Sequence, residues 1–529
     1  MSTLPGRLRK LPTRNVVFAL AIAALIAILL TAGTIQGRDD FSTIRKLGKG
    51  ATYSKTSASK DTEDRRFVIV VPVDGPGPDL CKVLTSAIAI GYPSPIIVNW
   101  GKDFHKGGGF GSSHLGKITG ALEYLDGVTG ESGHADDKLN DNDLVLIVDA
   151  YDIWFQLPPE VLLQRFHENN RKANERLAEQ WNGNDVPMKQ TIIVSTQKKC
   201  FPLPDAGSNL HCDALPDSPL PSDLYGPSTD MDPKVNPNGY HDIRPKFINS
   251  GSIMGPVGDM RKFLRQAKHK MDAGIANDVH LFSDQGIFGE VLGEQEVWRN
   301  WQRMLHRSRA LPIGEEATTI QQNMEYHVGL DYYQNVFIPT VMEDDDGQFI
   351  RLSNRTTIAE YSSDLGISPV RLEGAPNDLS GVHNPLADVA KDRENLSWEE
   401  MPLYADFYTT AVPVIVHHNA HKDGRKERRT QWWDRTWYFP HLRALVTMQL
   451  QRTELQPLAM LDTENGSKVV YTAPISHTTK RRPRKFISPP GDKAEPIEEV
   501  DFRDVCRFEE EKEGQHWYDE VFRDNKGPL

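Results

Sequence analysis

The chain has 529 residues with ordinary apolar (38%) and charged (25%) fractions, enough for one large globular domain or two medium ones plus appendages. Its formal net charge of −12 argues against a non-specific nucleic-acid binder, because such proteins need clustered Lys and Arg to displace counterions from phosphate. We therefore expect no nucleic-acid partner.

The N-terminus carries the clearest targeting signal. Basic residues such as Arg7 and Arg14 precede a charge-free, mostly apolar run over residues 16–35, and acidic residues follow it. About twenty helical residues cross a hydrocarbon core of roughly 30 Å, and this charge order favours a cytosolic N-terminus. The alternative is a cleaved signal peptide, with small residues at Thr31-Ala32-Gly33 near a cleavage point.

We therefore predict a single-pass type II membrane protein of the Golgi or endoplasmic reticulum, with its main domain in the lumen. The predicted organisation is a cytosolic tail (1–15), a transmembrane signal anchor (16–35), a polar stem (36–66), a lumenal domain (67–440) and a C-terminal extension (441–529).

Four cysteines are too few and too scattered for a disulfide scaffold or a zinc ribbon. A lumenal setting permits disulfides, and Cys200 with Cys212 would close a short loop, but the pairing of these two with Cys81 and Cys506 stays open. Tripeptides that fit the N-glycosylation acceptor pattern agree with a lumenal domain; they begin at Asn354, Asn395 and Asn465.

Apolar strand-like runs alternate with helical segments through the first part of the domain. This alternation predicts βαβ crossovers and an α/β fold with a mostly parallel open sheet and flanking helices. Strands are expected at 67–73, 95–100, 144–148 and 191–195, and helices at 80–90, 115–125 and 159–180. Two polar stretches, 201–244 and 344–400, predict long surface loops, and the charge runs at 480–485 and 509–511 predict solvated surface.

A pair of carboxylates, Asp149 and Asp152, comes directly after the apolar strand 144–148. Ligands of open α/β sheets bind beyond the carboxyl ends of the strands. Two carboxylates held close together repel each other, and a divalent cation relieves that repulsion. The pair therefore predicts a metal site, with the alternative that Asp152 caps the helix beginning near Pro158.

A second apolar run, 413–416, ends in His417-His418-Asn419. An imidazole is an acceptable ligand for Mn²⁺ and a less natural one for Mg²⁺ or Ca²⁺. A structural histidine is the alternative. We expect His417 to complete the site begun by the two aspartates.

Two further segments carry small polar residues. The run 246–255 contains Gly and Ser, which suit close backbone approach to a sugar or phosphate. Ser283-Asp284-Gln285-Gly286 opens a probable helix, where Asp284 is either an N-terminal cap or a carboxylate facing a sugar hydroxyl.

In this order, the segments resemble the glycosyltransferase domain of the procollagen lysyl hydroxylase/glycosyltransferase enzymes and related collagen-type galactosyltransferases, over roughly residues 67–440. The family's Asp-x-Tyr-Asp, Leu-Asn-Ser-Gly-Gly, acidic-Asp-Gln and Val-Val-His-Gly-Asn motifs are similar to Asp149-Ala150-Tyr151-Asp152, Ile248-Asn249-Ser250-Gly251-Ser252, Ser283-Asp284-Gln285 and Ile415-Val416-His417-His418-Asn419.

The resemblance implies a GT-A type fold, a UDP-sugar donor, and Mn²⁺, with Mg²⁺ as the alternative, bound by Asp149, Asp152 and His417. Tyr151 would stack on the uracil ring. Lys117 falls where the family has a lysine and would meet the diphosphate as a point charge; a solvated helix lysine is its alternative.

The resemblance also assigns the two small polar segments to the donor. Asn249, Ser250, Gly251 and Gln285 would contact it, and Asp284 would position donor hydroxyls or act as a base. The chain departs from the family in two places: Phe282-Ser283 stands where the family has acids, and Cys200-Phe201-Pro202 replaces Cys-Trp-Pro.

The resulting hypothesis is a metal-dependent glycosyltransferase that moves a hexose from a UDP-sugar to a glycan or glycoprotein acceptor. The alternatives are a non-catalytic lumenal carbohydrate-binding or scaffold protein of the same fold, and a metal-dependent hydrolase that uses the same aspartates. No iron site of the hydroxylase half of the animal enzymes is recognisable, so collagen need not be the acceptor.

Overall fold

A computed structural model describes most of the chain after residue 61: 62–102, 112–131, 135–203, 207–308, 322–390, 396–420, 427–452, 456–463, 466–474, 482–487, 497–510 and 512–529. The predicted transmembrane segment 16–35 lies outside these residues. Within them, no helix combines the length and the apolar character needed to cross a bilayer.

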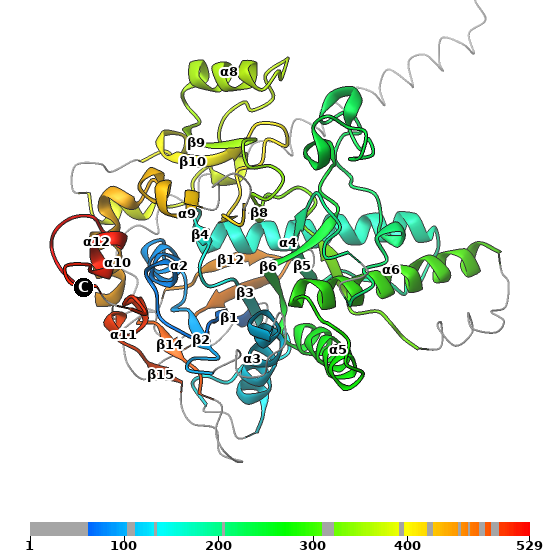
Figure 1. The fold of residues 1–529 in the computed structure, drawn as a ribbon, viewed down its shortest axis with the longest axis horizontal. Helices are drawn as coiled ribbons and strands as arrows, with labels where there is room; N and C mark the ends of the chain where they lie inside the picture. The colour runs from blue at the N-terminus through cyan, green and yellow to red at the C-terminus, as the bar shows by residue number, and fades with distance from the viewer. Residues whose placement is uncertain are drawn as a thin grey trace, which may run out of the picture. The chain divides into compact units, whose positions relative to one another are not determined.

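The fold is α/β, built on an open and mostly parallel sheet flanked by helices (Figure 1). Among the described residues, ten strands belong to this sheet, eight of them in the order β15-β14-β2-β1-β3-β6-β5-β7. Their bounds are β1 (Thr62–Pro72), β2 (Ile96–Val98), β3 (Leu144–Val148), β5 (Ile192–Gln197), β6 (Phe247–Pro256), β7 (Val328–Leu330), β12 (Ala459–Asp462), β13 (Lys468–Thr472), β14 (Arg484–Lys485) and β15 (Glu498–Glu499).

The centre of the sheet combines both strand directions. β1 runs parallel to β2 and β3, whereas β6 runs antiparallel to both β3 and β5. A parallel neighbour needs a crossover, usually a helix, but β5 and β6 are joined by the long segment 198–246, which returns the chain in the opposite direction. As a result, residues of β6 lie beside the end of β3, where the carboxylates follow.

Alternate side chains of β1 belong to two separate cores, as expected for a strand that is covered on both faces. Phe67, Ile69 and Val71 belong to one core, and Val68 and Val70 to the other. This explains why the strand is a continuous apolar run rather than an alternating one.

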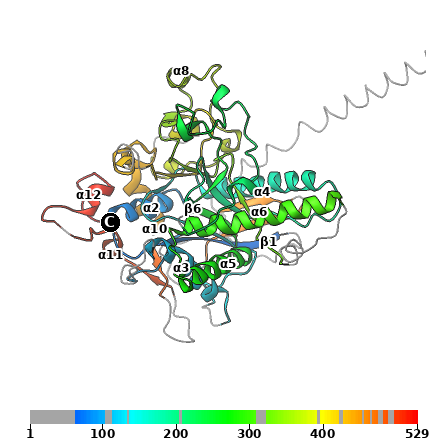
Figure 2. The ribbon, with the colours of Figure 1, turned by 45° about the vertical axis from the view of Figure 1, so that its right-hand side comes forward.

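Helices cover both faces of the sheet (Figures 1 and 2). Helices α2 (Pro78–Ala89), α4 (Pro159–Trp181) and α10 (Leu442–Gln451) contribute to the first core. Helices α3 (Ser112–Thr129), α5 (Val257–Ala276) and α6 (Asp284–Ser308) contribute to the second, and α5 contacts both α3 and α6.

A small three-stranded sheet brings distant segments close to the carboxyl end of β3 in the large sheet. Its middle strand, β11 (Ile415–His417), is antiparallel to β4 (Ile153–Phe155) and parallel to β8 (Phe337–Pro339). β4 begins directly after Asp152, so this pairing places the end of β11 beside the carboxylates.

The strands and helices predicted before residue 196 are found, with shifted ends. β1 begins earlier, inside the predicted stem, because its first residues pair with β13, which the sequence could not reveal. The interpretation of 344–400 as loop is wrong: this stretch contains β9 (Gly347–Arg351) and α8 (Arg355–Asp364), and β9 pairs with β10 (Pro402–Asp406). Buried Ile350 and Ile358 anchor these elements in the first core.

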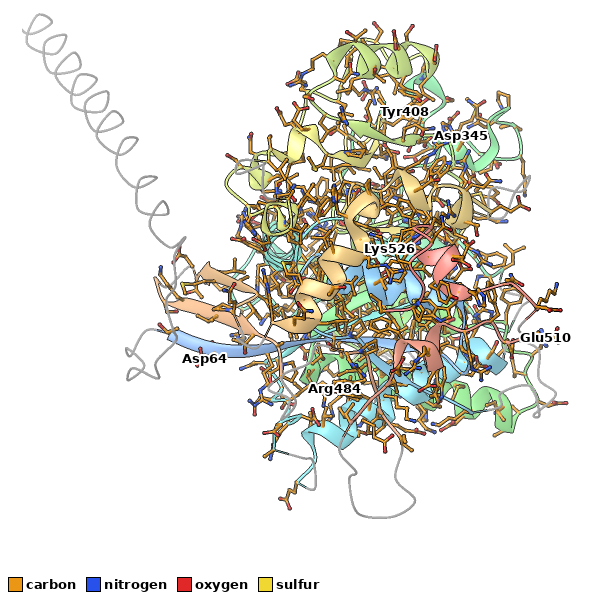
Figure 3. All side chains as sticks on the ribbon, turned by 90° about the vertical axis from the view of Figure 1, so that its left-hand side faces the viewer. Asp64, Asp345, Tyr408, Arg484, Glu510 and Lys526 are labelled. Carbon is orange, nitrogen blue, oxygen red and sulfur yellow. A yellow bond between two sulfur atoms is a disulfide. The ribbon has the colours of Figure 1, made fainter. Side chains whose placement is uncertain are left out.

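The C-terminal extension contributes strands β12, β13, β14 and β15 to the same sheet. It also contains the short helices α11 (Phe502–Cys506) and α12 (Trp517–Val521), and the short helix α9 (Arg428–Gln431) precedes it. Figure 3 labels Asp64 on β1, beside β13, and Arg484 on β14. Arg484 is buried and pairs with Asp137, so the prediction of a solvated basic run is wrong at this position.

Two disulfides connect the four cysteines. Cys200–Cys212 closes the short loop considered from the sequence, and Cys81–Cys506 joins α2 to α11. Disulfides persist in oxidising compartments, so both bonds indicate a domain of the secretory pathway.

Candidate metal centre

Asp149 and Asp152 occupy the turn between β3 and β4. The amide of Asp149 donates to the carbonyl of Gly251 at 2.9 Å, which keeps the start of the turn against β6. The carbonyl of Asp152 accepts from the amide of His418 at 2.7 Å, which ties the end of the turn to β11. Backbone hydrogen bonds on both sides therefore fix the positions of the two carboxylates.

His417 meets both carboxylates although it is far from them in sequence. Its Nε2 lies 3.2 Å from Oδ1 of Asp152 and 3.6 Å from Oδ2 of Asp149. The ligand atoms of the three residues all lie within 4.8 Å of one another. The side chain of His417 is almost buried, whereas that of Asp149 is 31% exposed, so the cluster opens toward solvent on the Asp149 side.

These three residues could hold a metal ion. Ligand atoms at right angles around an ion, each about 2.1 Å from it, lie about 3.0 Å apart, close to the separations from His417. Burial alone would lower the pKa of His417, but Asp152 and Asp149 outweigh burial and raise it. The same concentration of negative charge that attracts a proton also attracts a cation.

Asn249 orients the imidazole. Its Oδ1 lies 3.2 Å from Nδ1 of His417, and its Nδ2 donates to Oε1 of Gln197 at 2.9 Å. The second contact fixes which end of the amide is the acceptor, so Nδ1 of His417 donates and Nε2 is left as the ligand atom toward the aspartates. The sequence assigned Asn249 to donor binding and gave no signal of this contact.

Gly251 provides the space for the imidazole. A Cβ atom built at this position would lie 2.2 Å from Cε1 of His417, a distance that no side chain tolerates. Gly251 is therefore required by close approach of the histidine. The sequence singled out this glycine but assigned it to the donor.

Lys117 lies in the same cluster. Its Nζ is 2.6 Å from Oδ1 of Asp149 and 2.7 Å from Oδ2 of Asp284, and it donates to the carbonyl of Ser250 at 3.0 Å. Burial would lower the pKa of Lys117, but the two carboxylates outweigh burial and raise it, so the amine stays charged. Lys117 is 7% exposed, and the alternative of a solvated helix lysine is therefore wrong.

Asp284 and Gln285 open α6 beside Ser250. Asp284 is 2% exposed, and its carboxylate pairs with Lys117. Oε1 of Gln285 accepts from the amide of Ser250 at 3.3 Å, and its Nε2 donates to the carbonyl of Phe201 at 2.7 Å. Gln285 thus bridges β6 and the segment that carries the Cys200–Cys212 disulfide.

Tyr151 stands between the two aspartates in sequence and is 38% exposed. Burial of part of its ring and the negative charge of Asp74 raise its pKa to about 12, so the phenol is neutral at physiological pH. An exposed, neutral aromatic ring beside a cluster that could hold a cation is available for stacking against a planar group.

His418, next to the candidate ligand, is enclosed by aromatic side chains. Its ring centroid lies 4.0 Å from that of Trp154, and Phe349, Tyr404 and Trp432 also contact it. Burial lowers its pKa to about 3, and neither ring nitrogen has a hydrogen-bond partner within the described part of the chain. The two adjacent histidines therefore have opposite environments, which the sequence did not distinguish.

The predicted site residues thus gather beyond the carboxyl end of β3, around the first half of β6, the end of β11 and the start of α6. Comparison of the sequence with protein-family models and with curated proteins gives no match.

Proposed function

We propose that this chain is a metal-dependent glycosyltransferase with a GT-A type fold, which moves a hexose from a UDP-sugar to a glycan or glycoprotein acceptor. One observation carries the proposal: Asp149 and Asp152, in the turn after β3, meet His417 at the end of β11 beside an exposed aromatic ring, Tyr151. A cation site next to a stacking surface suits a nucleoside diphosphate.

Asp149, Asp152 and His417 would hold Mn²⁺, with Mg²⁺ as the alternative. Two carboxylates and an imidazole form a donor set that Mn²⁺ accepts more readily than Mg²⁺ does. The ion would supply positive charge that neutralises the departing nucleoside diphosphate. Asn249 supports this assignment because its contact with Nδ1 turns Nε2 of His417 toward the aspartates, where it can bind the ion once its proton has left.

The other residues of the cluster have separate roles in this proposal. Tyr151 stacks on the uracil ring, and Lys117 holds a fixed positive charge beside the diphosphate. Asp284 orients Lys117 through their ion pair and faces donor hydroxyls; its role as a base stays a prediction. Ser250 and Gln285 form the wall between β6 and α6 on the sugar side.

The proposed location is the lumen of the Golgi or endoplasmic reticulum, with residues 16–35 as a type II signal anchor. The two disulfides support the lumenal side, since such bonds are rare in the cytosol. The exposed Asn354, the first residue of an acceptor tripeptide, is compatible with glycosylation there.

A non-catalytic carbohydrate-binding protein of the same fold is the second candidate. It is favoured by the pairing of Asp284 with Lys117, because a buried carboxylate that is held in an ion pair is poorly placed to accept a proton from an acceptor hydroxyl. The first candidate requires this pair to open or the acceptor to be activated by another group.

A UDP-release screen of the full chain in detergent, across UDP-sugars with Mn²⁺ and mixed glycan acceptors, tests the proposal. We expect UDP release with at least one donor, loss of release with EDTA, and loss in Asp149→Ala. Release of free sugar without an acceptor would instead indicate a hydrolase. Binding of UDP without release from any donor would favour the carbohydrate-binding protein.

A further inference from the structure

The C-terminal extension reaches the metal centre through α2. Cys81 in the first turns of α2 is bonded to Cys506 at the end of α11, and both cysteines are fully buried. One residue earlier, the carbonyl of Val505 accepts from the amide of Gly77 at 3.0 Å. A covalent bond and a backbone hydrogen bond therefore hold α11 at the N-terminal end of α2.

Helix α12 strengthens this attachment, and Figure 1 shows α11 and α12 beside α2. Lys82 of α2, which is 1% exposed, places its Nζ 2.7 Å from Oε1 of Glu520. The indole Nε1 of Trp433 donates to the carbonyl of Val521 at 2.7 Å. Because these contacts are largely buried, the extension is a fixed part of the domain rather than a loose tail.

The attachment point borders Tyr151. A Cβ atom built on Gly77, the residue whose amide binds Val505, would lie 3.9 Å from Cε1 of the Tyr151 ring. Phe508 packs against the first core, which fixes the chain beyond the disulfide. Glu509 follows at once and is exposed.

We infer that the C-terminal segment 502–510 forms the outer wall of the nucleotide end of the site, beside the base stacked on Tyr151, and that Cys81–Cys506 holds it there. This inference rests on the proposed function. The wall thus adds a side to the face contact that Tyr151 supplies.

The test is calorimetric binding of UDP, in the presence of Mn²⁺, to the full chain and one double variant. The double variant Cys81→Ser with Cys506→Ser releases the wall. Mn²⁺ binding alone is measured for each, because the inferred role of the wall concerns the nucleotide and not the metal.

We expect the double cysteine variant to weaken UDP binding about tenfold, with Mn²⁺ affinity unchanged. Hydrogen exchange should show slower exchange of amides in 502–510 when UDP and Mn²⁺ are added to the original chain. Because this readout needs no variant, it decides the question even where the cysteine variant does not fold.

Unchanged UDP affinity in the double cysteine variant, together with unchanged exchange in 502–510, would overturn the inference while the proposed function stands. Absence of UDP binding to the original chain in Mn²⁺ would instead contradict the proposed function itself. The two failures are therefore distinguished by one measurement on the unaltered protein.

Discussion

Nδ1 of His417 lies 3.2 Å from Oδ1 of Asn249, on the side of the imidazole opposite the aspartates. The contact connects β6 to β11 and determines which ring nitrogen faces Asp149 and Asp152. Loss of a group that holds a metal-binding histidine in orientation typically weakens metal affinity about 10- to 100-fold. The sequence did not reveal this contact.

Asn249→Ala is expected to weaken Mn²⁺ binding about 10- to 100-fold, because the imidazole loses its orienting acceptor. Isothermal calorimetry with Mn²⁺ checks this value. Asn249→Asp is the conservative comparison, since its carboxylate still accepts from Nδ1, and it should retain most of the affinity. Equal losses in the two variants would mean that Asn249 acts only on the fold.

Gly251→Ala is expected to displace the imidazole, because the added Cβ would meet Cε1 of His417 at 2.2 Å. Crowding of this kind costs about 1–3 kcal/mol of folding stability and should abolish tight Mn²⁺ binding. Gly75→Ala is the matched control, since nothing lies within 4 Å of a Cβ at that position. Unfolding curves and metal titrations of both variants provide the measurement. Normal metal binding by Gly251→Ala would contradict the described packing.

His418→Phe is expected to change the free energy of unfolding by less than about 1 kcal/mol, or to increase it. Phenylalanine retains the aromatic contact with Trp154 and removes two buried nitrogens that lack partners among the described residues. His417→Phe should abolish Mn²⁺ binding, whereas His418→Phe should leave it intact. Metal titration of the two variants side by side checks the assignment, and the reverse order of effects would refute it.

A buried ionic network attaches the segment 207–246 to the β9–β10 pair and predicts a pH dependence of stability. His241 contacts Asp242 at 2.7 Å and Asp346 at 2.6 Å, and Asp346 also pairs with Lys198. Burial and the charge of Lys198 lower the pKa of His241, but the two aspartates outweigh them and raise it. The aromatic rings of Tyr225 and Tyr408 face the same imidazole.

Because the pKa of His241 is higher in the folded state than its ordinary value of 6.5, its contribution to stability is complete below pH 6.5. That contribution is lost as the pH rises through the folded pKa. His241→Gln should therefore destabilise the protein by roughly 1–2 kcal/mol at pH 6 and by less at pH 8. Chemical unfolding at several pH values checks this, and a difference that grows with pH would contradict it.

Local patterns predicted the parts of the structure that depend on neighbouring residues. The apolar run before Asp149 predicted β3 and the position of the carboxylates at its end, as observed. The contact of Lys117 with Asp284 could not be predicted, because the two residues are far apart in sequence and each has an ordinary local role at a helix start. The antiparallel direction of β6 was missed for a similar reason, since the long segment before it has no periodic pattern.

The C-terminal extension shows the same limit. Arg484 lies in a charge run that is typical of solvated surface, yet it is buried because β14 pairs with β2 and Asp137 neutralises its charge. Cys506 had no sequence feature that identified Cys81 as its partner. Long-range pairing decides these positions, and a single sequence contains little information about it.

Electron paramagnetic resonance of Mn²⁺ titrated into the full chain tests the central claim most directly, because free and bound Mn²⁺ give different signals. We predict one tight site, abolished separately by Asp149→Ala, Asp152→Ala and His417→Ala, while all three variants unfold cooperatively. Mn²⁺ binding that survives each of these substitutions, or no binding by the original chain, would contradict a metal centre built from these residues.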